Sequence, residues 1–204
     1  DMTRFATKRR TCLLPMALVL AAPFTLTACK DEPTPDTTES VATRDDGTLT
    51  LAAALGADED LGKTQEAIEQ SQLVGVLDGP ASYTLLAPTN EAFAEYGVEA
   101  DALFDDASRP VLAAIVRNHV LPGHLTPEAI GAAIDRKRGP VSMTTLGNAT
   151  VTFSRDGGNI RVATEGGQPA SFAEGAAAVN NGVLIPIDRL LLLRRDAAEP
   201  SNPD

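Results

Sequence analysis

The hydrophobic pattern of the chain changes its period at Gly139-Pro140, and this change constrains the fold more than any other feature. Before this point, several segments space their apolar residues at helical intervals. After it, residues 141–164, "VSMTTLGNATVTFSRDGGNIRVAT", alternate between apolar and polar residues as strands do. Helical segments followed by strands are typical of α+β proteins. We therefore predict an α+β fold over residues 48–193.

Two helices are predicted from apolar spacing and from their boundary residues. The first covers "QEAIEQSQLVGVL", residues 65–77, and ends at Gly79-Pro80. The second covers "LTPEAIGAAI", residues 125–134, with Thr126 at the N-cap and Pro127 at the first helical position. Between them, "YTLLAP" (83–88) predicts a short strand that stops at its proline.

Two further helices are predicted in the middle of the chain. "EAFAEYG" (91–97) follows a cap at Thr89 or Asn90 and ends at Gly97. The next helix begins with Ser108 as its N-cap and continues to Pro122-Gly123. One face of this helix carries Leu112, Ile115, Val116 and His119.

The last part of the chain predicts a hairpin and a long apolar strand. Across a turn at Asp156-Gly157-Gly158, Val151 and Phe153 share a face with Ile160 and Val162. Asn181-Gly182 then leads into "VLIPIDRLLLL". Pro186 has no N–H, so we expect it at a sheet edge or a bulge. The segment is more apolar than a half-exposed strand needs, which leaves two interpretations: a strand buried on both faces, or the lining of a groove.

The N-terminal segment is predicted to be a leader rather than part of the fold. Four basic residues within 1–10 precede the apolar run "TCLLPMALVLAAPFTLTA" (11–28), which is the order of a secretory signal peptide. Leu26, Thr27, Ala28 and Cys29 resemble the bacterial lipobox. That resemblance implies cleavage of residues 1–28 and lipidation of Cys29. An ordinary cleavage that leaves Cys29 free is the alternative.

The remaining boundaries follow from composition. Residues 30–47, "KDEPTPDTTESVATRDDG", contain little that could be buried, so we predict a disordered tether over residues 29–47. Residues 194–204 form a polar tail that we predict to be disordered. The layout predicts an exported protein anchored to a bacterial membrane through Cys29. Lys30 stands where an aspartate would favour inner-membrane retention, which favours the outer membrane. The outer membrane or the periplasmic face is preferred to the cytoplasm.

Charge and cysteine content exclude several classes of function. Removing residues 1–28 takes four basic residues and one acidic residue from totals of 17 and 28, which leaves 13 against 27 and a net charge of −14. Phosphate contacts need clustered Lys and Arg, so we expect no nucleic-acid partner. None of the acidic groups has the ligand spacing of a calcium loop.

Of the two cysteines, Cys12 is predicted to be removed with the leader, so no disulfide and no cysteine-based metal site is expected.

Three stretches in order resemble the fasciclin-type domain family. "YTLLAPTNEAFA" (83–94) resembles its first box, including Ala87, Pro88, Thr89 and Asn90. "AIVRNHVLPGHLT" (114–126) resembles its central segment around His119. "NGVLIPIDRLLLL" (181–193) resembles its second box, with Asn181, Gly182 and Asp188. The resemblance covers about residues 48–193 and implies β-sandwich-like sheets packed against several helices.

The sequence departs from that family at two positions. Asn118 stands where the family commonly has a tyrosine before the histidine, and Ile185 stands where the second box often has a histidine. Because the Tyr-His region of animal members is associated with integrin binding, that activity is not carried over to this chain. Whether Asn118 alters binding is an open question at this stage.

The two histidines raise the question of chemistry. His119 lies on the apolar face of its helix and His124 lies beyond the Pro-Gly stop, so they do not form a helical metal pair. No nucleophile motif accompanies them. We predict that His119 is a core residue whose ring nitrogens are hydrogen-bonded, that His124 is exposed, and that Thr89 or Asn90 caps a helix. No catalytic residue, metal or cofactor is expected.

The sequence therefore favours a membrane-anchored adhesion or interaction module with an unidentified protein or matrix partner. An apolar small molecule, carotenoid-like or lipid-like, is the alternative ligand, as the resemblance to bacterial members implies. The scarcity of aromatic residues, with no Trp in the chain, weighs against it. An enzyme is the least favoured class.

Overall fold

The computed structural model of the chain describes residues 43–193. The predicted leader, the lipobox residues Leu26 to Ala28, the lipidation site Cys29 and the tail 194–204 lie outside the described residues.

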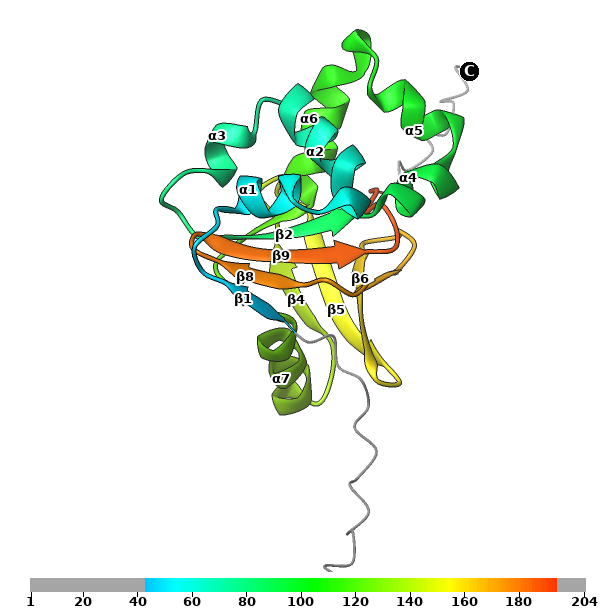
Figure 1. Ribbon diagram of the computed structural model, residues 1–204. Coiled ribbons are helices and arrows are strands. Elements are labelled where there is room, and N and C mark those ends of the chain that lie inside the picture. The colour runs from blue at the N-terminus through cyan, green and yellow to red at the C-terminus, as the bar shows by residue number, and fades with distance from the viewer. Residues whose placement is uncertain (1–42, 194–204) are drawn as a thin grey trace, which may run out of the picture. The chain divides into compact units, whose positions relative to one another are not determined.

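Two β-sheets form the centre of the domain (Figure 1). The five-stranded sheet has the order β1-β8-β9-β2-β3, and the four-stranded sheet has the order β4-β5-β6-β7. The first sheet consists of β1 (Arg44–Asp46), β8 (Ala177–Val179), β9 (Gly182–Ile187), β2 (Tyr83–Pro88) and β3 (Val120–Pro122). The second consists of β4 (Val141–Thr144), β5 (Thr150–Asp156), β6 (Asn159–Thr164) and β7 (Ala170–Ser171).

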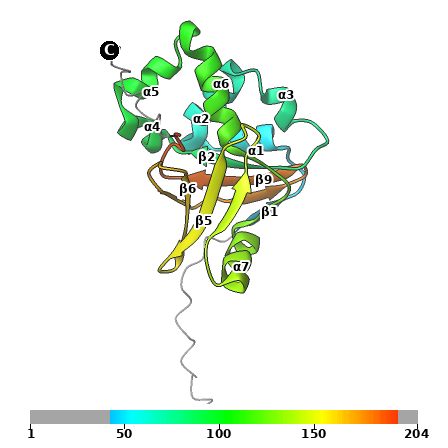
Figure 2. The ribbon, with the colours of Figure 1, turned by 180° about the vertical axis from the view of Figure 1, so that it is seen from behind.

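Helices cover the five-stranded sheet on the face away from the second sheet, and one helix lies at the opposite end (Figures 1 and 2). The covering layer consists of α1 (Leu51–Gly56), α2 (Gly62–Gln70), α3 (Val74–Leu77), α4 (Asn90–Tyr96), α5 (Val98–Leu103) and α6 (Arg109–Asn118), with short 3₁₀ turns at Glu59–Leu61 and Asp106–Ser108. The separate helix is α7 (Pro127–Lys137). The predicted α+β class, with sandwich-like sheets packed against helices, is confirmed. None of the helices within residues 43–193 is long and apolar enough to cross a bilayer.

The central strands β2 and β9 are buried on both faces. Leu85 and Leu184 point into the core beneath the helical layer, whereas Leu86 and Ile185 point into the core between the two sheets. Each fully buried leucine or isoleucine contributes about 1.5–3 kcal/mol through the hydrophobic effect. The two-sided burial explains why residues 183–187 are continuously apolar, and it confirms the first of the two interpretations of that segment.

The predicted hairpin and the helix at α7 are also confirmed. Val162 lies opposite Phe153 across β5 and β6, and both side chains are fully buried. Thr126 caps α7 by accepting a hydrogen bond from the N–H of Ala129 at 3.2 Å.

The prediction of one continuous helix over residues 65–77 is wrong, because the structure has two helices there, α2 and α3. After α2, the N–H of Leu73 bonds the carbonyl of Ile68 at 3.1 Å, and Gln72 adopts a left-handed conformation with φ of 57°. This closure ends α2 and starts α3 in a new direction. Leu73 and Leu77 remain buried in the same core as Ile68, which is why their spacing resembles a single helix.

The helix predicted to continue to Pro122-Gly123 ends earlier, at Asn118. His119 is its C-cap, and β3 begins at Val120 because that residue pairs with Leu85 of β2. Ser108 occupies the N-cap position as predicted, but its side chain makes no capping hydrogen bond. Its backbone is still turning in the preceding 3₁₀ segment, with φ −90° and ψ −5°, rather than extended as a side-chain cap requires.

Two other predictions are corrected. Pro186 is not in an edge strand: it lies in the inner strand β9, opposite Ala87 of β2, and the expected edge is present only locally, on the side facing β8. Its missing N–H is tolerated because it lies beyond Leu184, the last residue of β9 that pairs with β8. The predicted tether does not extend to residue 47, because β1 (Arg44–Asp46) pairs in parallel with β8 and joins the five-stranded sheet. The folded domain thus includes Thr43 and β1.

Candidate functional site

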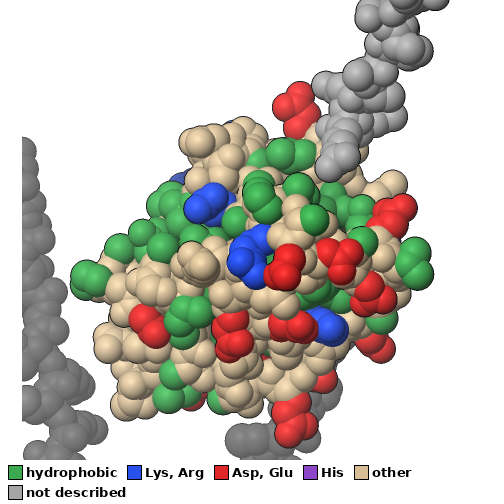
Figure 3. All heavy atoms as spheres, turned by 90° about the horizontal axis from the view of Figure 1, so that it is seen from above, with side chains coloured by type: hydrophobic (Ala, Val, Ile, Leu, Met, Phe, Trp, Pro, Cys, Tyr) green, Lys and Arg blue, Asp and Glu red, His purple; other side chains and the backbone are tan. Residues whose placement is uncertain are grey.

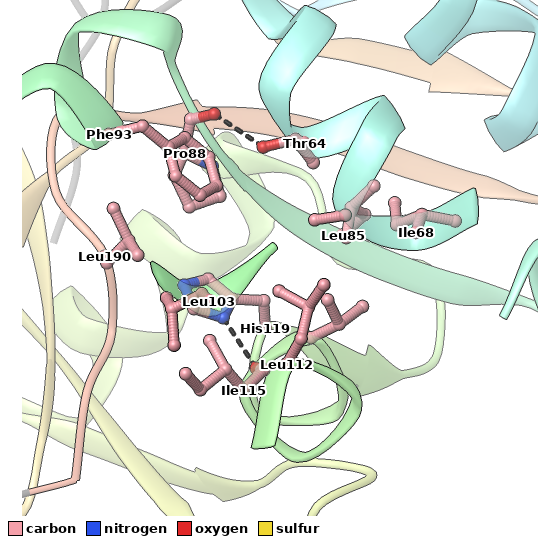
Figure 4. A pocket seen from close by; sticks show the side chains of 12 residues that line it. Thr64, Ile68, Leu85, Pro88, Phe93, Leu103, Leu112, Ile115, His119 and Leu190 are labelled. Carbon is pink, nitrogen blue, oxygen red and sulfur yellow. Dashed lines mark hydrogen bonds between the residues drawn. The ribbon is translucent and has the colours of Figure 1, made fainter. Parts of the chain in front are cut away.

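His119 connects the three sequence stretches that carry the family resemblance. Its backbone carbonyl accepts a hydrogen bond from the N–H of Leu86 in the first stretch at 2.9 Å. Its Nε2 accepts a hydrogen bond from the N–H of Leu191, past β9, also at 2.9 Å. Its Nδ1 lies 2.8 Å from the carbonyl oxygen of Ile115 in the preceding turn of α6, as drawn in Figure 4. The histidine is therefore a junction between distant segments.

These contacts determine the protonation state of the ring. Since Nε2 accepts from an amide, the proton of the neutral ring lies on Nδ1, which donates to the Ile115 carbonyl. The side chain is 3% exposed. Burial lowers the pKa of His119 from 6.5 to about 4, although the hydrogen bond to Ile115 opposes that shift. The ring is neutral at physiological pH and both nitrogens are engaged.

The geometry of His119 suits a structural role and not proton transfer, because a general base needs a nitrogen that can reach a substrate. The prediction of a buried, hydrogen-bonded His119 is confirmed. His124 is exposed, as predicted. In the described part of the chain, no group of three or more His, Cys, Asp or Glu side chains could hold a metal ion.

The first and second boxes lie side by side as neighbouring parallel strands. Ala87 and Pro88 of β2 pair with Pro186 and Ile187 of β9, and the pairing runs from Tyr83 to Pro88 without interruption. Pro88 also accepts a hydrogen bond from the buried hydroxyl of Thr64 on α2 at 2.6 Å, the second contact drawn in Figure 4. These motif residues attach the helical layer to the centre of the sheet.

Asn181 holds two helices at the entry to β9. Its Oδ1 accepts the N–H of Leu51, the first residue of α1, at 2.8 Å. Its Nδ2 donates to the carbonyls of Leu77, at the end of α3, and Gly79, at 2.6 and 3.1 Å. One amide thus pairs a helix start with a helix end, whose backbone groups have no partner inside the helix.

The next residue, Gly182, is a glycine because the structure leaves no room for a side chain at this position. A Cβ there would collide with the backbone oxygen of Tyr83 and would lie 2.6 Å from Cδ1 of Leu51. The glycine is required by the close approach of β2 and α1.

Thr89, Asn90 and Asp188 also have structural roles. Thr89 caps α4 by accepting the N–H of Ala92 at 3.2 Å, which confirms one of the two predicted caps. Asn90 instead links to the start of α2: its Oδ1 accepts the N–H of Lys63 at 2.9 Å. Asp188 accepts the N–H of Ser171 at 2.7 Å, and its own N–H donates to the carbonyl of Ser171.

Asn118, the residue that departs from the family pattern, is buried at the end of α6. Its Oδ1 is 3.4 Å from the hydroxyl of Thr145, and its side chain packs against the backbone of Gly147, where a Cβ would collide with it. The small amide and the glycine are thus matched across the β4–β5 turn.

The pocket beside His119 is small and apolar. It has a volume of about 20 Å³ and lies between α2, α6 and β2 (Figure 4). That is room for about one water molecule, whereas sites for organic ligands have volumes of roughly 300–1,000 Å³. The pocket at the centre of the motif residues therefore does not accommodate a pigment or a lipid chain.

The larger hollows lie on the helical surface, which the sequence did not predict as a site. We call one of them the α5–α6 groove: it has a volume of about 700 Å³ and lies between α5, α6 and Leu192-Leu193. A second, of about 680 Å³, lies between α2, α4 and α5. The one signal in the sequence was the presence of Val98 and Val111 outside the predicted apolar faces.

Comparisons with known proteins agree with this architecture. Residues 59–193 match the sequence profile of the Fasciclin family, described as the fasciclin domain. Among curated proteins, Protein sll1483 from Synechocystis sp. is 24% identical over 148 residues, which is 72% of this chain and 75% of that protein.

Among solved structures, the FAS1 domain pair from the insect cell adhesion molecule fasciclin I aligns with a TM-score of 0.63 at 16% identity. The alignment covers 72% of this chain and 52% of that one, so the chain spans about half the length of the domain pair. At this identity the likeness shows the fold alone.

Proposed function

The chain belongs to the fasciclin domain family, and from that premise we propose that it is a membrane-anchored, extracytoplasmic module for adhesion or protein interaction. Fasciclin domains are known adhesion and protein-interaction modules, are usually extracellular or exported, and are typically not enzymes. The anchor is the lipidated Cys29, and the partner is a protein or matrix component. We also propose that this chain has no catalytic activity.

The observation that carries the interaction role is the position of the exposed hydrophobic side chains. Within residues 43–193, the four exposed large hydrophobic residues are Tyr96, Val98, Val111 and Leu193. Three of them line the α5–α6 groove, and Val98 lines the neighbouring hollow. Gathered exposed apolar groups mark interaction surfaces on soluble domains. The polar motif residues, in contrast, are used inside the fold.

The anchor is supported by residue order and by where the described domain begins. The basic and apolar leader and the lipobox-like Leu26-Thr27-Ala28 precede Cys29. Thr43 then enters the domain beside α7, where its N–H and hydroxyl donate to the carboxylate of Glu128 at 3.1 and 2.9 Å. The helical layer lies at the end of the sandwich opposite α7 (Figure 1), away from the point where the described chain begins.

Binding of an apolar small molecule remains a second candidate. The volume and apolar lining of the α5–α6 groove favour it, and the 20 Å³ pocket beside His119 argues against an interior site. Such a ligand would bind at the surface and would be detected by organic extraction of the protein purified from its own membranes.

The test uses the full chain and its Cys29→Ala variant, expressed in a Gram-negative host. We expect the full chain in the membrane fraction, with a lipid mass on the peptide that begins at Cys29, and the variant in the soluble fraction. We also expect cells that display the full chain to aggregate or adhere more than cells that express the variant. An unmodified Cys29 would overturn the anchor. Equal adhesion of cells that display the anchored chain and cells that lack the gene would overturn the adhesive role.

A further inference from the structure

The α5–α6 groove combines an apolar floor with an exposed position. Leu103, Ile115 and Leu192 line it, together with Val111 and Leu193, which are 41% and 48% exposed. Burying such side chains against a partner is favourable, whereas leaving them in water has no compensating contact. Within the described residues, the groove therefore combines apolar lining and accessibility, as a docking surface does.

The helices that border the groove are acidic. From α4 through α6 the chain carries Glu91, Glu95, Glu99, Asp101, Asp105 and Asp106 against Arg109 and Arg117. Arg109 pairs with Asp106 at 2.7 Å, and Glu95 pairs with Arg189 at 3.5 Å. The other four carboxylates have no ion pair with a residue in 43–193, and Glu99 lines the groove itself. Figure 3 looks onto this helical layer, where acidic side chains outnumber basic ones and hydrophobic side chains lie among them.

We propose that the α5–α6 groove is the docking site for a basic amphipathic segment of a partner protein. The apolar face of the segment fills the groove, and its Lys or Arg side chains lie against Glu99 and the neighbouring carboxylates. A groove between helices accepts apolar side chains spaced three and four residues apart on a docked helix. Opposite charges on the rim steer the approach and orient the partner. This inference rests on the proposed interaction function and adds the site and the chemistry of the partner.

Two other occupants are disfavoured by charge and composition. A second copy would bring the same acidic rims together, since a symmetric contact places like surfaces face to face, and the chain carries a net charge of −11. Residues 194–204 of the chain, "RRDAAEPSNPD", contain two arginines but no large apolar side chain that could fill the groove, so they do not match its apolar floor. An anionic membrane surface is disfavoured by the same rim charges.

The test measures binding of two model peptides to the full-length chain that carries Cys29→Ala, so that anchoring has no part in it. The peptides are amphipathic helices of roughly 18 residues, long enough to form a helix on binding. One is built from Leu and Lys and the other from Leu and Glu. Affinity is measured by calorimetry, and the contacted residues by NMR.

Each groove variant has a matched control at the other end of the domain. Val111→Ser removes apolar surface at the third residue of α6, and Ala129→Ser changes the same position of α7, where the side chain is also exposed. Glu99→Lys reverses a charge in the groove, and Asp45→Lys reverses an exposed charge on β1. Thermal unfolding of all four variants tests whether they remain folded.

We expect the Lys peptide to change the NMR signals of α5, α6 and Leu192-Leu193. Each groove variant should lower the affinity for this peptide by about tenfold. The control variants change its affinity by less than about twofold, and the Glu peptide binds at least about tenfold more weakly. Equal losses in groove and control variants, or equal binding of the two peptides, would overturn the proposal. So would perturbations confined to another face. Loss of an extractable apolar molecule in Val111→Ser, with peptide binding unchanged, would assign the groove to a small ligand instead.

The result is independent of the anchoring test. If the Lys peptide binds the groove but Cys29 proves not to be lipidated, the docking site is retained and the membrane anchor is rejected. Conversely, an adhesive, lipidated chain whose groove variants adhere normally would retain the proposed function and overturn this site.

Discussion

The ring of His119 is hydrogen-bonded to the backbone N–H of Leu191, 72 residues further along the chain, at 2.9 Å. The bond ties the end of α6 to the segment after β9, and Nδ1 of the same ring is bonded within α6 to Ile115. A residue type often associated with catalysis is thus used here as a fully buried cross-link, and its properties should be visible in stability rather than in turnover.

The first prediction concerns pH. The folded pKa of His119 is about 4 and its ordinary value is 6.5, so the unfolded chain binds a proton first as the pH falls. The stability that this residue contributes is present above 6.5 and is lost as the pH falls towards 4. Between about pH 7.5 and pH 5 we expect the loss of about 2 kcal/mol of unfolding free energy from this residue. Urea unfolding at the two pH values measures it.

Replacement of His119 by phenylalanine isolates that contribution. His119→Phe leaves the N–H of Leu191 buried and unpaired, which costs about 1–3 kcal/mol at neutral pH, and it removes the loss between about pH 7.5 and pH 5. His124→Gln, at an exposed position, is the control and retains the pH dependence of the parent. Identical pH profiles of parent and His119→Phe would contradict the assignment.

The second prediction concerns Asn181. Asn181→Ala removes three hydrogen bonds to Leu51, Leu77 and Gly79, and we expect a loss of about 2–4 kcal/mol in unfolding free energy. Asn181→Asp keeps the acceptor for Leu51 but places a carboxylate oxygen against the carbonyl oxygens of Leu77 and Gly79, so its loss should be at least as large as that of alanine. Chemical denaturation ranks the three proteins; a loss below 1 kcal/mol in Asn181→Ala would argue that water replaces the amide, since an unmet buried group costs about 1–3 kcal/mol.

The third prediction compares two glycines. Gly182→Ala places a methyl group against the Tyr83 backbone and Leu51, and we expect destabilisation of about 3 kcal/mol or more from overpacking. Gly75→Ala in α3 meets no atom within 4 Å, so it should stabilise the protein by roughly 0.5–1 kcal/mol through helix propensity. Melting temperatures of the two variants should therefore move in opposite directions. A tolerated Gly182→Ala would mean that β2 and α1 separate more easily than their packing indicates.

The fourth prediction concerns the start of the folded domain. A chain that begins at Thr43 keeps β1 and the two hydrogen bonds to Glu128, whereas one that begins at Thr48 loses both. We expect the shorter chain to be less stable by about 1–2 kcal/mol, from two lost hydrogen bonds and the exposed edge of β8. Differential scanning calorimetry of the two chains decides the boundary. Equal stability of the two chains would mean that the folded domain begins at Thr48, as the sequence predicted.

Local patterns in the sequence predicted local structure well. The helix of α7 with its Thr126 cap, the β5–β6 hairpin with Phe153 and Val162 on one face, and the cap at Thr89 all depend on residues close together in the chain. The sequence failed where a tertiary contact overrides such a pattern. Val120 leaves the helical period because it pairs with Leu85 in the sheet, and Arg44–Asp46 are polar residues that the edge of β8 orders.

The properties of the site also divide into those that the sequence determined and those that the tertiary structure decided. The sequence alone determined the fold class, the family resemblance, the acidic character and the burial of His119, because period, composition and motif order are properties of short segments. Only the tertiary structure decided that Leu191 is the partner of His119, that β2 and β9 lie side by side, and that Val111 and Leu193 share an exposed groove. The physical reason is that these relationships join segments distant in the chain, and their geometry depends on which faces pack together when all elements compete to bury apolar surface.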